Sequence, residues 1–158
     1  MIRYVLAVLL TTALLGIGLI AVQEVAVVRT ETQVEGAITD IERAAVSLLA
    51  YDDPVSGDIP PPRRVLDIEI PPGGFTTEDI ETLRFEPVTE SNWTAVRYKI
   101  DGRPTNTVFL DVPLVNAADD TATLDISGSS SLTLVLELVS DSGHKPVVQV
   151  RIGLQDEP

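Results

Sequence analysis

Residues 4–22 read YVLAVLLTTALLGIGLIAV, a run of 19 residues without a charged side chain. As an α-helix this run would be roughly 28 Å long, which matches the hydrocarbon core of a bilayer, about 30 Å thick. Arg3 precedes the run, and positive charge stays on the cytoplasmic side of membranes. We therefore expect a single-pass transmembrane helix with a cytoplasmic N-terminus and an extracellular C-terminal domain. The alternative is a cleaved secretory signal, whose apolar region is usually shorter, about 7–15 residues.

The helical pattern continues beyond the apolar run, over residues 23–50. Apolar residues recur there at spacings of three and four, with charged residues between them, as in an amphipathic helix. This predicts a helix over residues 1–50, transmembrane in 4–22 and amphipathic in 23–50, that ends before Pro54. Its interaction face comprises Val27, Val34, Ile38, Ile41, Ala45 and Leu48. This stripe can pack on the chain's own globular domain or on helices of neighbouring copies, and the sequence leaves both alternatives open.

Residues 51–64 predict a proline-rich linker, in which Pro60-Pro61-Pro62 favours a stiff extended conformation. Residues 65–158 then alternate apolar and polar side chains in short runs separated by turn residues. That pattern is typical of antiparallel strands in a sandwich or a small barrel. We also expect a short helix over residues 76–83 and a hairpin turn at Asp101-Gly102. The chain is thus predicted to be an α+β protein, with a long N-terminal helix followed by an antiparallel β-sandwich-like domain.

The composition limits the functions that such a protein can have. The net charge is −13, with 24 acidic and 11 basic side chains, which argues against nucleic-acid binding because that needs clustered Lys and Arg. The excess of carboxylates is typical of proteins from high-salt environments, although ordinary acidic domains share it. There is no Cys, and His144 is the only His, which excludes disulfides, a thiol nucleophile and a multi-histidine metal site. We expect no catalytic residues, no cofactor and no metal.

Two groups of charged residues are best explained as ordinary surface features, namely an arginine pair and the loop aspartates. The arginines Arg63 and Arg64 are expected to be exposed or to pair with Asp67 or Glu69, and such pairs stabilise a fold little. Loop aspartates could in principle bind Ca²⁺, but solvated surface is the favoured interpretation. These aspartates are Asp52, Asp53, Asp58, Asp119 and Asp120.

The triplet Asn92-Trp93-Thr94 matches the acceptor motif for N-glycosylation, with Asn92 as the modified residue. It falls in a predicted turn before a strand and agrees with an extracellular domain. Trp93 is the only Trp, and we expect it to pack on the sheet.

Several segments together resemble a haloarchaeal family of unknown function with type IV pilin-like architecture. They are MIRYVLAVLLTTALLG at the N-terminus, Ser47-Leu48-Leu49, Arg63-Arg64-Val65, residues 98–104 (YKIDGRP) and residues 145–148 (KPVV). Members of that family tend to be encoded in pilus-like or secretion gene clusters, with an assembly ATPase and a polytopic platform protein. Archaeal prepilins usually carry a basic leader, whereas only Met-Ile-Arg precedes Tyr4. The resemblance therefore favours an accessory subunit that keeps its N-terminus.

These observations lead us to expect a pilin-like, membrane-anchored accessory subunit of an archaeal type IV pilus-like or secretion assembly. It would act by structural interaction with the membrane and with other pilin-like or assembly-platform proteins, and it could form homo-oligomers. One alternative is a membrane-tethered extracellular binding module, and another is a secreted β domain after signal cleavage. An enzyme is least favoured, because the sequence contains no evident nucleophile–base or metal constellation.

Overall fold

The computed structural model describes residues 2–55, 59–70, 73–74, 77–88, 91–118, 123–126, 131–140 and 145–153, and within 17–24 it describes the helix but not the side chains. One long helix, α1 (Ile2–Tyr51), is followed by β1 (Arg63–Glu69), β2 (Ile80–Pro87), β3 (Thr94–Ile100), β4 (Asn106–Leu110), β5 (Leu114–Asn116), β6 (Leu124–Asp125), β7 (Ser131–Ser140) and β8 (Pro146–Gly153). This order confirms the predicted α+β class.

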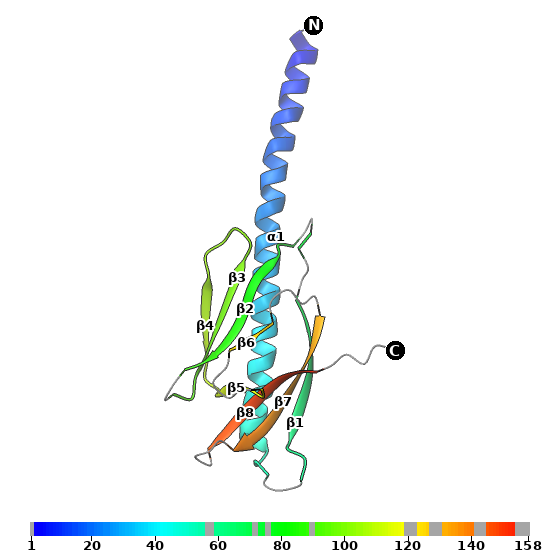
Figure 1. Cartoon of the computed structure of the whole chain (residues 1–158). Helices are drawn as coiled ribbons and strands as arrows, with labels where there is room; N and C mark the ends of the chain where they lie inside the picture. Colours follow the sequence, from blue (N-terminus) through cyan, green and yellow to red (C-terminus); the bar gives the residue numbers. More distant parts are fainter. Residues whose placement is uncertain are drawn as a thin grey trace.

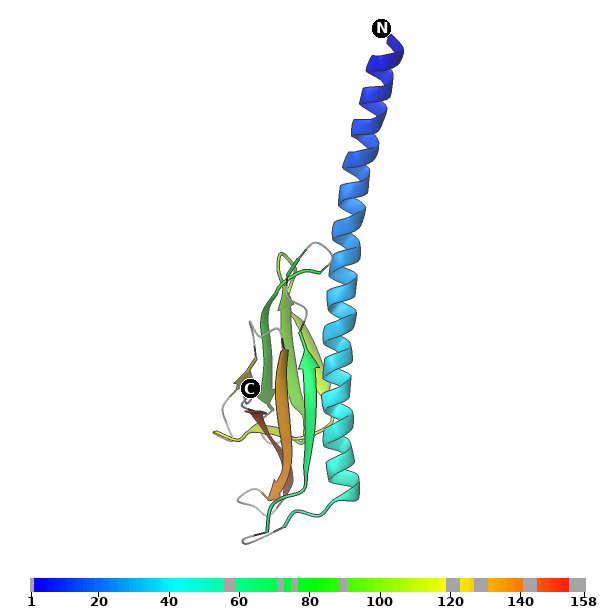
Figure 2. The same ribbon diagram turned by 90° about the vertical axis from the view of Figure 1, so that its right-hand side faces the viewer.

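The helix α1 is 50 residues long, about 75 Å at 1.5 Å per residue. Its second half runs along one side of the β domain, and its first half projects beyond the domain (Figures 1 and 2). The last helical hydrogen bond joins the Asp52 N–H to the Leu48 carbonyl, and Pro54 follows, as predicted for the helix end. The linker is held by an ion pair of 2.8 Å between Arg64 and Asp52. Arg64 therefore pairs with the end of the helix rather than with Asp67, the strand partner considered from the sequence.

The strands form two four-stranded sheets, with the orders β1-β7-β8-β5 and β4-β3-β2-β6. All pairs are antiparallel except β5 and β8, which run parallel. The β3–β4 hairpin turns at the predicted dipeptide, where Gly102 has a φ of 67°, a value that glycine adopts readily. The segment after β4 crosses from one sheet to the other to begin β5.

The helix expected over residues 76–83 is wrong, because the described residues from Ile80 onward form strand β2. Ile80 and Leu83 are both buried, and their spacing of three imitates a helical period. The register between β2 and β3 shifts between Ile80 and Thr82. Such a bulge adds one residue to a strand and brings two positions three apart onto the same face.

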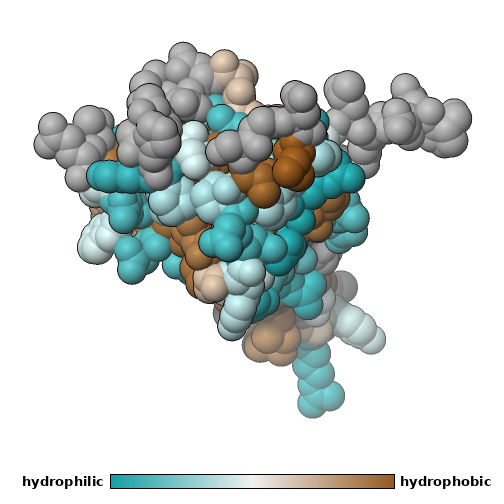
Figure 3. Space-filling view, turned by 90° about the horizontal axis from the view of Figure 1, so that it is seen from below, coloured by the Kyte–Doolittle hydropathy of each residue, from teal (hydrophilic) through white to brown (hydrophobic). Residues whose placement is uncertain are grey.

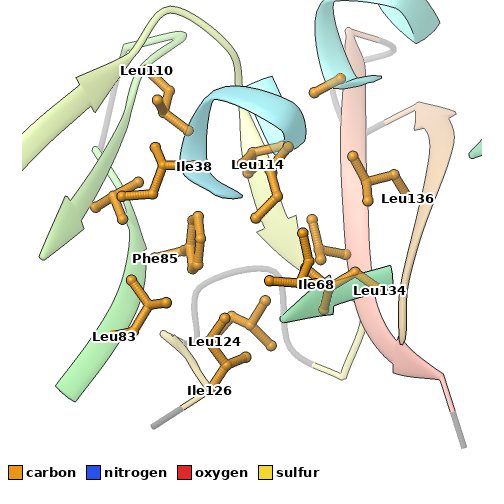
Figure 4. Packing of buried hydrophobic residues seen from close by; sticks show 14 of the residues in the cluster. Ile38, Ile68, Leu83, Phe85, Leu110, Leu114, Leu124, Ile126, Leu134 and Leu136 are labelled. Carbon is orange, nitrogen blue, oxygen red and sulfur yellow. The ribbon is translucent and has the colours of Figure 1, made fainter. Parts of the chain in front are cut away.

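One hydrophobic core lies between the two sheets and includes the inner face of α1. Figure 4 shows Ile38 of the helix among side chains from both sheets, including Leu110 of β4, Leu114 of β5 and Leu134 of β7. The residues of β7 that alternate inward are buried as predicted, and they are Leu132, Leu134, Leu136 and Leu138. The second half of the helix and the sandwich therefore share one core.

Candidate functional site

The structure places the predicted interaction face of α1 largely inside the chain's own core. Five of its members are at most 3% exposed and belong to the same cluster as side chains from both sheets: Val34, Ile38, Ile41, Ala45 and Leu48. The sixth, Val27, is half-buried and lines a cavity of about 270 Å³ together with Arg103. The stripe thus packs within the molecule, and a partner of the folded chain has to contact other parts of the helix.

The N-terminal half of α1 projects from the domain (Figure 2), and the large apolar side chains between residues 2 and 15 are exposed. Their exposed fractions run from 59% at Leu6 to 80% at Tyr4. The large apolar side chains in this group are Ile2, Tyr4, Val5, Leu6, Val8, Leu9, Leu10, Leu14 and Leu15. Exposed apolar surfaces of this extent normally mark contact with a membrane or another protein.

Among the described residues, no helical stretch is both long enough and apolar enough to cross a membrane. The side chains of residues 17–22, within the span predicted at 4–22, lie outside the described residues.

The buried face of α1 begins at Ala26 and Thr30. Ala26 is 2% exposed and Thr30 is fully buried. The Thr30 hydroxyl accepts a hydrogen bond from the Glu78 N–H at 2.9 Å and donates to the Glu78 carbonyl at 3.3 Å. Because this buried hydroxyl bonds both backbone groups of the half-buried Glu78, it fixes the position along α1 at which the helix begins to pack on the β domain.

The outer face of α1, opposite the core, carries small side chains among its charged ones. Val28 and Val46 are 60% and 45% exposed. The hydroxyls of Thr32 and Thr39 donate to the carbonyl oxygens four residues earlier, both at 2.8 Å. A Cβ added to Gly36 would meet nothing within 4 Å. The chain's own packing therefore gives no reason for this glycine, which costs about 1 kcal/mol relative to alanine inside a helix.

Gly36 also lines a groove of about 700 Å³ between α1 and β1. Carboxylates surround this groove: Asp40 pairs with Arg43 at 2.7 Å, Asp67 accepts a hydrogen bond from a strand threonine, and Glu69 is exposed. Within the described part of the chain, no group of three or more His, Cys, Asp or Glu side chains is placed to hold a metal ion. Of the loop aspartates considered for Ca²⁺, Asp58, Asp119 and Asp120 lie outside the described residues.

Polar contacts join α1 to the β3–β4 hairpin at the upper end of the domain. The Tyr98 hydroxyl donates to Glu35 at 3.4 Å, and the Asn106 amide donates to Glu31 at 3.3 Å. Burial raises the pKa of the Tyr98 phenol, and the negative charges of Glu35 and Glu31 raise it further, against an opposing hydrogen bond with Asn106. The phenol therefore stays neutral to a higher pH than an exposed tyrosine does.

The outer face of the β4-β3-β2-β6 sheet carries basic side chains that are each paired across strands. Arg84 contacts Asp125 at 2.9 Å and Arg97 contacts Glu86 at 3.4 Å. Lys99 pairs with Glu81, and the hydrogen bond from this lysine lowers the pKa of the Glu81 carboxyl. These pairs are exposed and stabilise the fold little. The positive charges on this face are therefore matched by carboxylates and do not form a basic patch.

The predicted glycosylation site lies in the turn between β2 and β3, which points away from the N-terminus of α1 (Figure 1). Asn92 is exposed. Trp93 and Phe109 are 50% and 58% exposed, and their ring centroids are 6.2 Å apart. A cavity of about 230 Å³ beside them is lined by Asn92, Trp93, Lys145 and Pro146, among others. Seen from this end, the surface mixes hydrophilic and hydrophobic residues (Figure 3).

Thr94, the third residue of the same motif, is fully buried. Its hydroxyl donates to the Val112 carbonyl at 2.8 Å and accepts from the Leu114 N–H at 2.9 Å. Val112 and Leu114 flank the point where the chain leaves the sheet of β4 and enters the sheet of β5. Thr94 therefore ties β3 to this crossover. The sequence contained one signal for this contact, namely a polar residue at an inward position of a predicted strand. The partners of the Thr94 hydroxyl could not be identified without the fold.

His144, the only histidine of the chain, lies outside the described residues, as do Ser129 and Ser130, and Ser131 is exposed at the start of β7.

Comparison with protein families gives one match, which spans residues 1–153 and is described as a domain of unknown function, DUF7311. The chain belongs to the DUF7311 family. The match includes the whole of α1 and every strand, so the helix and the sandwich together form the family's unit. No curated protein matches the chain, and no solved structure matches it.

Proposed function

We propose that this DUF7311 protein is a pilin-like, membrane-anchored accessory subunit of an archaeal type IV pilus-like or secretion assembly. It acts by structural interaction and not by catalysis. The apolar N-terminal half of α1 lies in the cell membrane as a single pass with its N-terminus in the cytoplasm. The β domain lies outside the cell, and the partners are other pilin-like or assembly-platform proteins.

The observation that supports this proposal most is the exposed apolar half of α1. Eight aliphatic side chains between residues 2 and 15 are at least 59% exposed. Burying such a side chain completely contributes about 1.5–3 kcal/mol. Transfer of this segment from water to an apolar environment would therefore be favourable by roughly 10 kcal/mol.

A rigid link between the anchor and the domain favours an assembly subunit over a flexible tether. The same helix contributes its first half to the anchor and its second half to the core. A continuous helix transmits its orientation, so the β domain would be held at a constant angle to the anchor. A subunit that stacks with neighbours requires such a constant angle, whereas a tethered binding module does not.

The outer face of α1 is the surface of the helix that remains available to neighbours. It carries charged side chains such as Arg43, but also small and β-branched side chains and Gly36, where a Cβ would meet nothing within 4 Å. Small residues at a contact between helices allow the two backbones to approach closely. The type IV pilin-like architecture of the family that the sequence resembles supports the same interpretation.

The first test is the intact mass of the native protein extracted from membranes. A full-length mass, or one that lacks only Met1, in the membrane fraction is the expected result, because the apolar segment acts as a permanent anchor. A chain that begins between Ala21 and Val25 and appears in the culture medium would show a secreted β domain and would overturn the proposal.

The second test uses the absence of native cysteine, which makes any introduced cysteine unique. The variants Thr39→Cys and Val46→Cys place a thiol on the outer face of α1. Thr107→Cys is the matched control, because Thr107 is exposed on β4 away from the helix. In native membranes, a photoreactive maleimide attached to the introduced thiol should, on illumination, cross-link the helix variants to neighbouring partner subunits and leave the control uncross-linked. Equal cross-linking of all three variants would contradict a helix-based assembly.

A further inference from the structure

The aromatic pair near the β2–β3 turn is an unusual surface feature of this chain. Only 4% of the residues are aromatic, and there is one Trp. Trp93 is nevertheless half exposed, in contact with the still more exposed Phe109. Trp is on average one of the more buried side chains. The adjoining cavity of about 230 Å³ is lined by Asn92 as well as by Trp93, and it is large enough for a single sugar ring.

Asn92 is the only asparagine that is followed at the second position by Ser or Thr. The turn that presents it is closed by hydrogen bonds on both sides. The Trp93 carbonyl accepts from the Val88 N–H at 3.0 Å, and the Trp93 N–H donates to the Ser91 hydroxyl at 3.3 Å. Thr94 is fully buried with its hydroxyl used twice. In the folded domain the acceptor amide is thus accessible, whereas the hydroxyl of the same motif is not.

We propose that Asn92 carries an N-linked glycan that is attached before the β domain folds, and that the first sugar of this glycan lies against the ring of Trp93, which packs on Phe109. The attached sugar is then the occupant of the cavity beside Trp93. Aromatic rings present an apolar face on which the C–H face of a sugar packs. The proposal rests on the proposed function in one respect, namely that the domain lies outside the cell.

The modification step transfers a glycan from a polyprenyl (di)phosphate donor. The side-chain nitrogen Nδ2 of Asn92 forms a bond to the anomeric carbon of the donor sugar. The bond between that carbon and the phosphate oxygen breaks, and the leaving lipid (di)phosphate takes the electron pair. Nδ2 loses one proton to solvent. A transferase recognises the motif through the hydroxyl at its third position, which is accessible only before β3 and the β4–β5 crossover come together.

The first experiment measures glycan occupancy of the full-length chain by intact mass and glycopeptide mass spectrometry, after expression in an archaeal host that contains such a transferase. The unchanged chain and Thr94→Ser should carry the glycan, because both have the hydroxyl. Asn92→Gln and Thr94→Val should lack it. An unmodified Asn92 in the unchanged chain would overturn the proposal and would leave Thr94 with its structural role alone.

The second experiment tests the order of modification and folding. Membranes that contain the transferase and its lipid-linked donor are given the full chain either folded in detergent micelles or unfolded in urea and diluted at the moment of assay. The folded chain should be modified more than about tenfold more slowly, because modification then requires local unfolding. Equal rates would overturn modification before folding.

The third experiment uses the single Trp as a reporter of the attached sugar. Acrylamide should quench Trp93 fluorescence roughly half as strongly in the glycosylated chain as in Asn92→Gln, because the sugar covers a half-exposed ring. In Phe109→Ala the difference should shrink, since the rings act as one platform. Equal quenching in the glycosylated and unglycosylated chains would overturn the stacking of the sugar.

A topology control separates failure of this inference from failure of the proposed function. Thr107→Cys is treated in intact cells with a maleimide that does not cross membranes. If the thiol reacts and Asn92 is unmodified, the glycan inference fails and the external placement of the domain stands. If the thiol reacts only after lysis and Asn92 is unmodified, both proposals fail.

Discussion

Replacing Thr94 by valine should destabilise the protein far more than its small change in size suggests. Valine has nearly the same shape as threonine but has no hydroxyl. In Thr94→Val, the Val112 carbonyl and the Leu114 N–H each lose a hydrogen bond of 2.8 or 2.9 Å. Both bonds are buried, so water cannot replace the hydroxyl without rearrangement of the crossover between the sheets.

The expected size of the effect follows from these two bonds. A buried polar group without a partner costs about 1–3 kcal/mol. With two such groups, and some gain from the more apolar side chain, we expect a loss of about 2–4 kcal/mol in the free energy of unfolding. Thr94→Ser is the matched control, because it keeps the hydroxyl and removes one methyl group, which costs about 1 kcal/mol.

The assay is urea denaturation of the full chain in detergent micelles, followed by the fluorescence of Trp93, the residue next to the substitution, and by far-ultraviolet circular dichroism. Coincident transitions from both probes would justify a two-state free energy. The reasoning would be refuted if Thr94→Val were as stable as Thr94→Ser, because the hydroxyl would then contribute nothing to the tie between the sheets.

Four further predictions concern the helix, its contact with β3 and the end of β8. Leu48→Ala should lower the free energy of unfolding by about 2–5 kcal/mol, because Leu48 is fully buried. Leu9→Ala, on the exposed half of the helix, should change it by less than about 0.5 kcal/mol in the same denaturation assay. Gly36→Ala should raise the thermal midpoint and increase the free energy of unfolding by up to about 1 kcal/mol, because the added Cβ would meet nothing within 4 Å. Gly153→Ala should lower the midpoint, because its Cβ would lie 3.2 Å from a strand carbonyl oxygen. Burial raises the pKa of Tyr98 above its ordinary 10.0, so its contribution to stability is complete below pH 10 and is lost as the pH rises through the folded value. Denaturation midpoints across this range should fall for the unchanged chain and fall less for Tyr98→Phe, and parallel curves would contradict the assignment.

Periodicity predicted the parts of this fold that depend on local pattern. The spacings from Val34 to Leu48 predicted the amphipathic half of α1, because a helix brings residues three and four apart onto one face. The alternating leucines of β7 predicted a strand for the analogous reason. The dipeptide Asp101-Gly102 predicted the hairpin, because glycine adopts the positive φ that the turn requires. In each case the signal lies within a few residues of the element that it predicts.

The periodicity of apolar residues was misleading where a strand with a bulge produces the same spacing as a helix. Ile80 and Leu83 lie three apart because of a bulge in β2, and a helix would have placed them on one face equally well. The parallel pairing of β5 with β8 could not be predicted either. Residues 114–116 are too few to show a period, and their direction depends on a crossover between the sheets.

The sequence by itself determined that a long helix precedes a β domain, that its first half is apolar, and that the chain is acidic and lacks cysteine. These properties depend on residue type and on spacing along the chain. Only the tertiary structure decided which faces are covered: the stripe from Val34 to Leu48 packs in the chain's own core, Thr30 and Thr94 are buried ties, and Trp93 is exposed. Burial is decided by contacts between residues far apart in the sequence, such as Thr94 with Val112, and a local pattern contains no information about which distant residues meet.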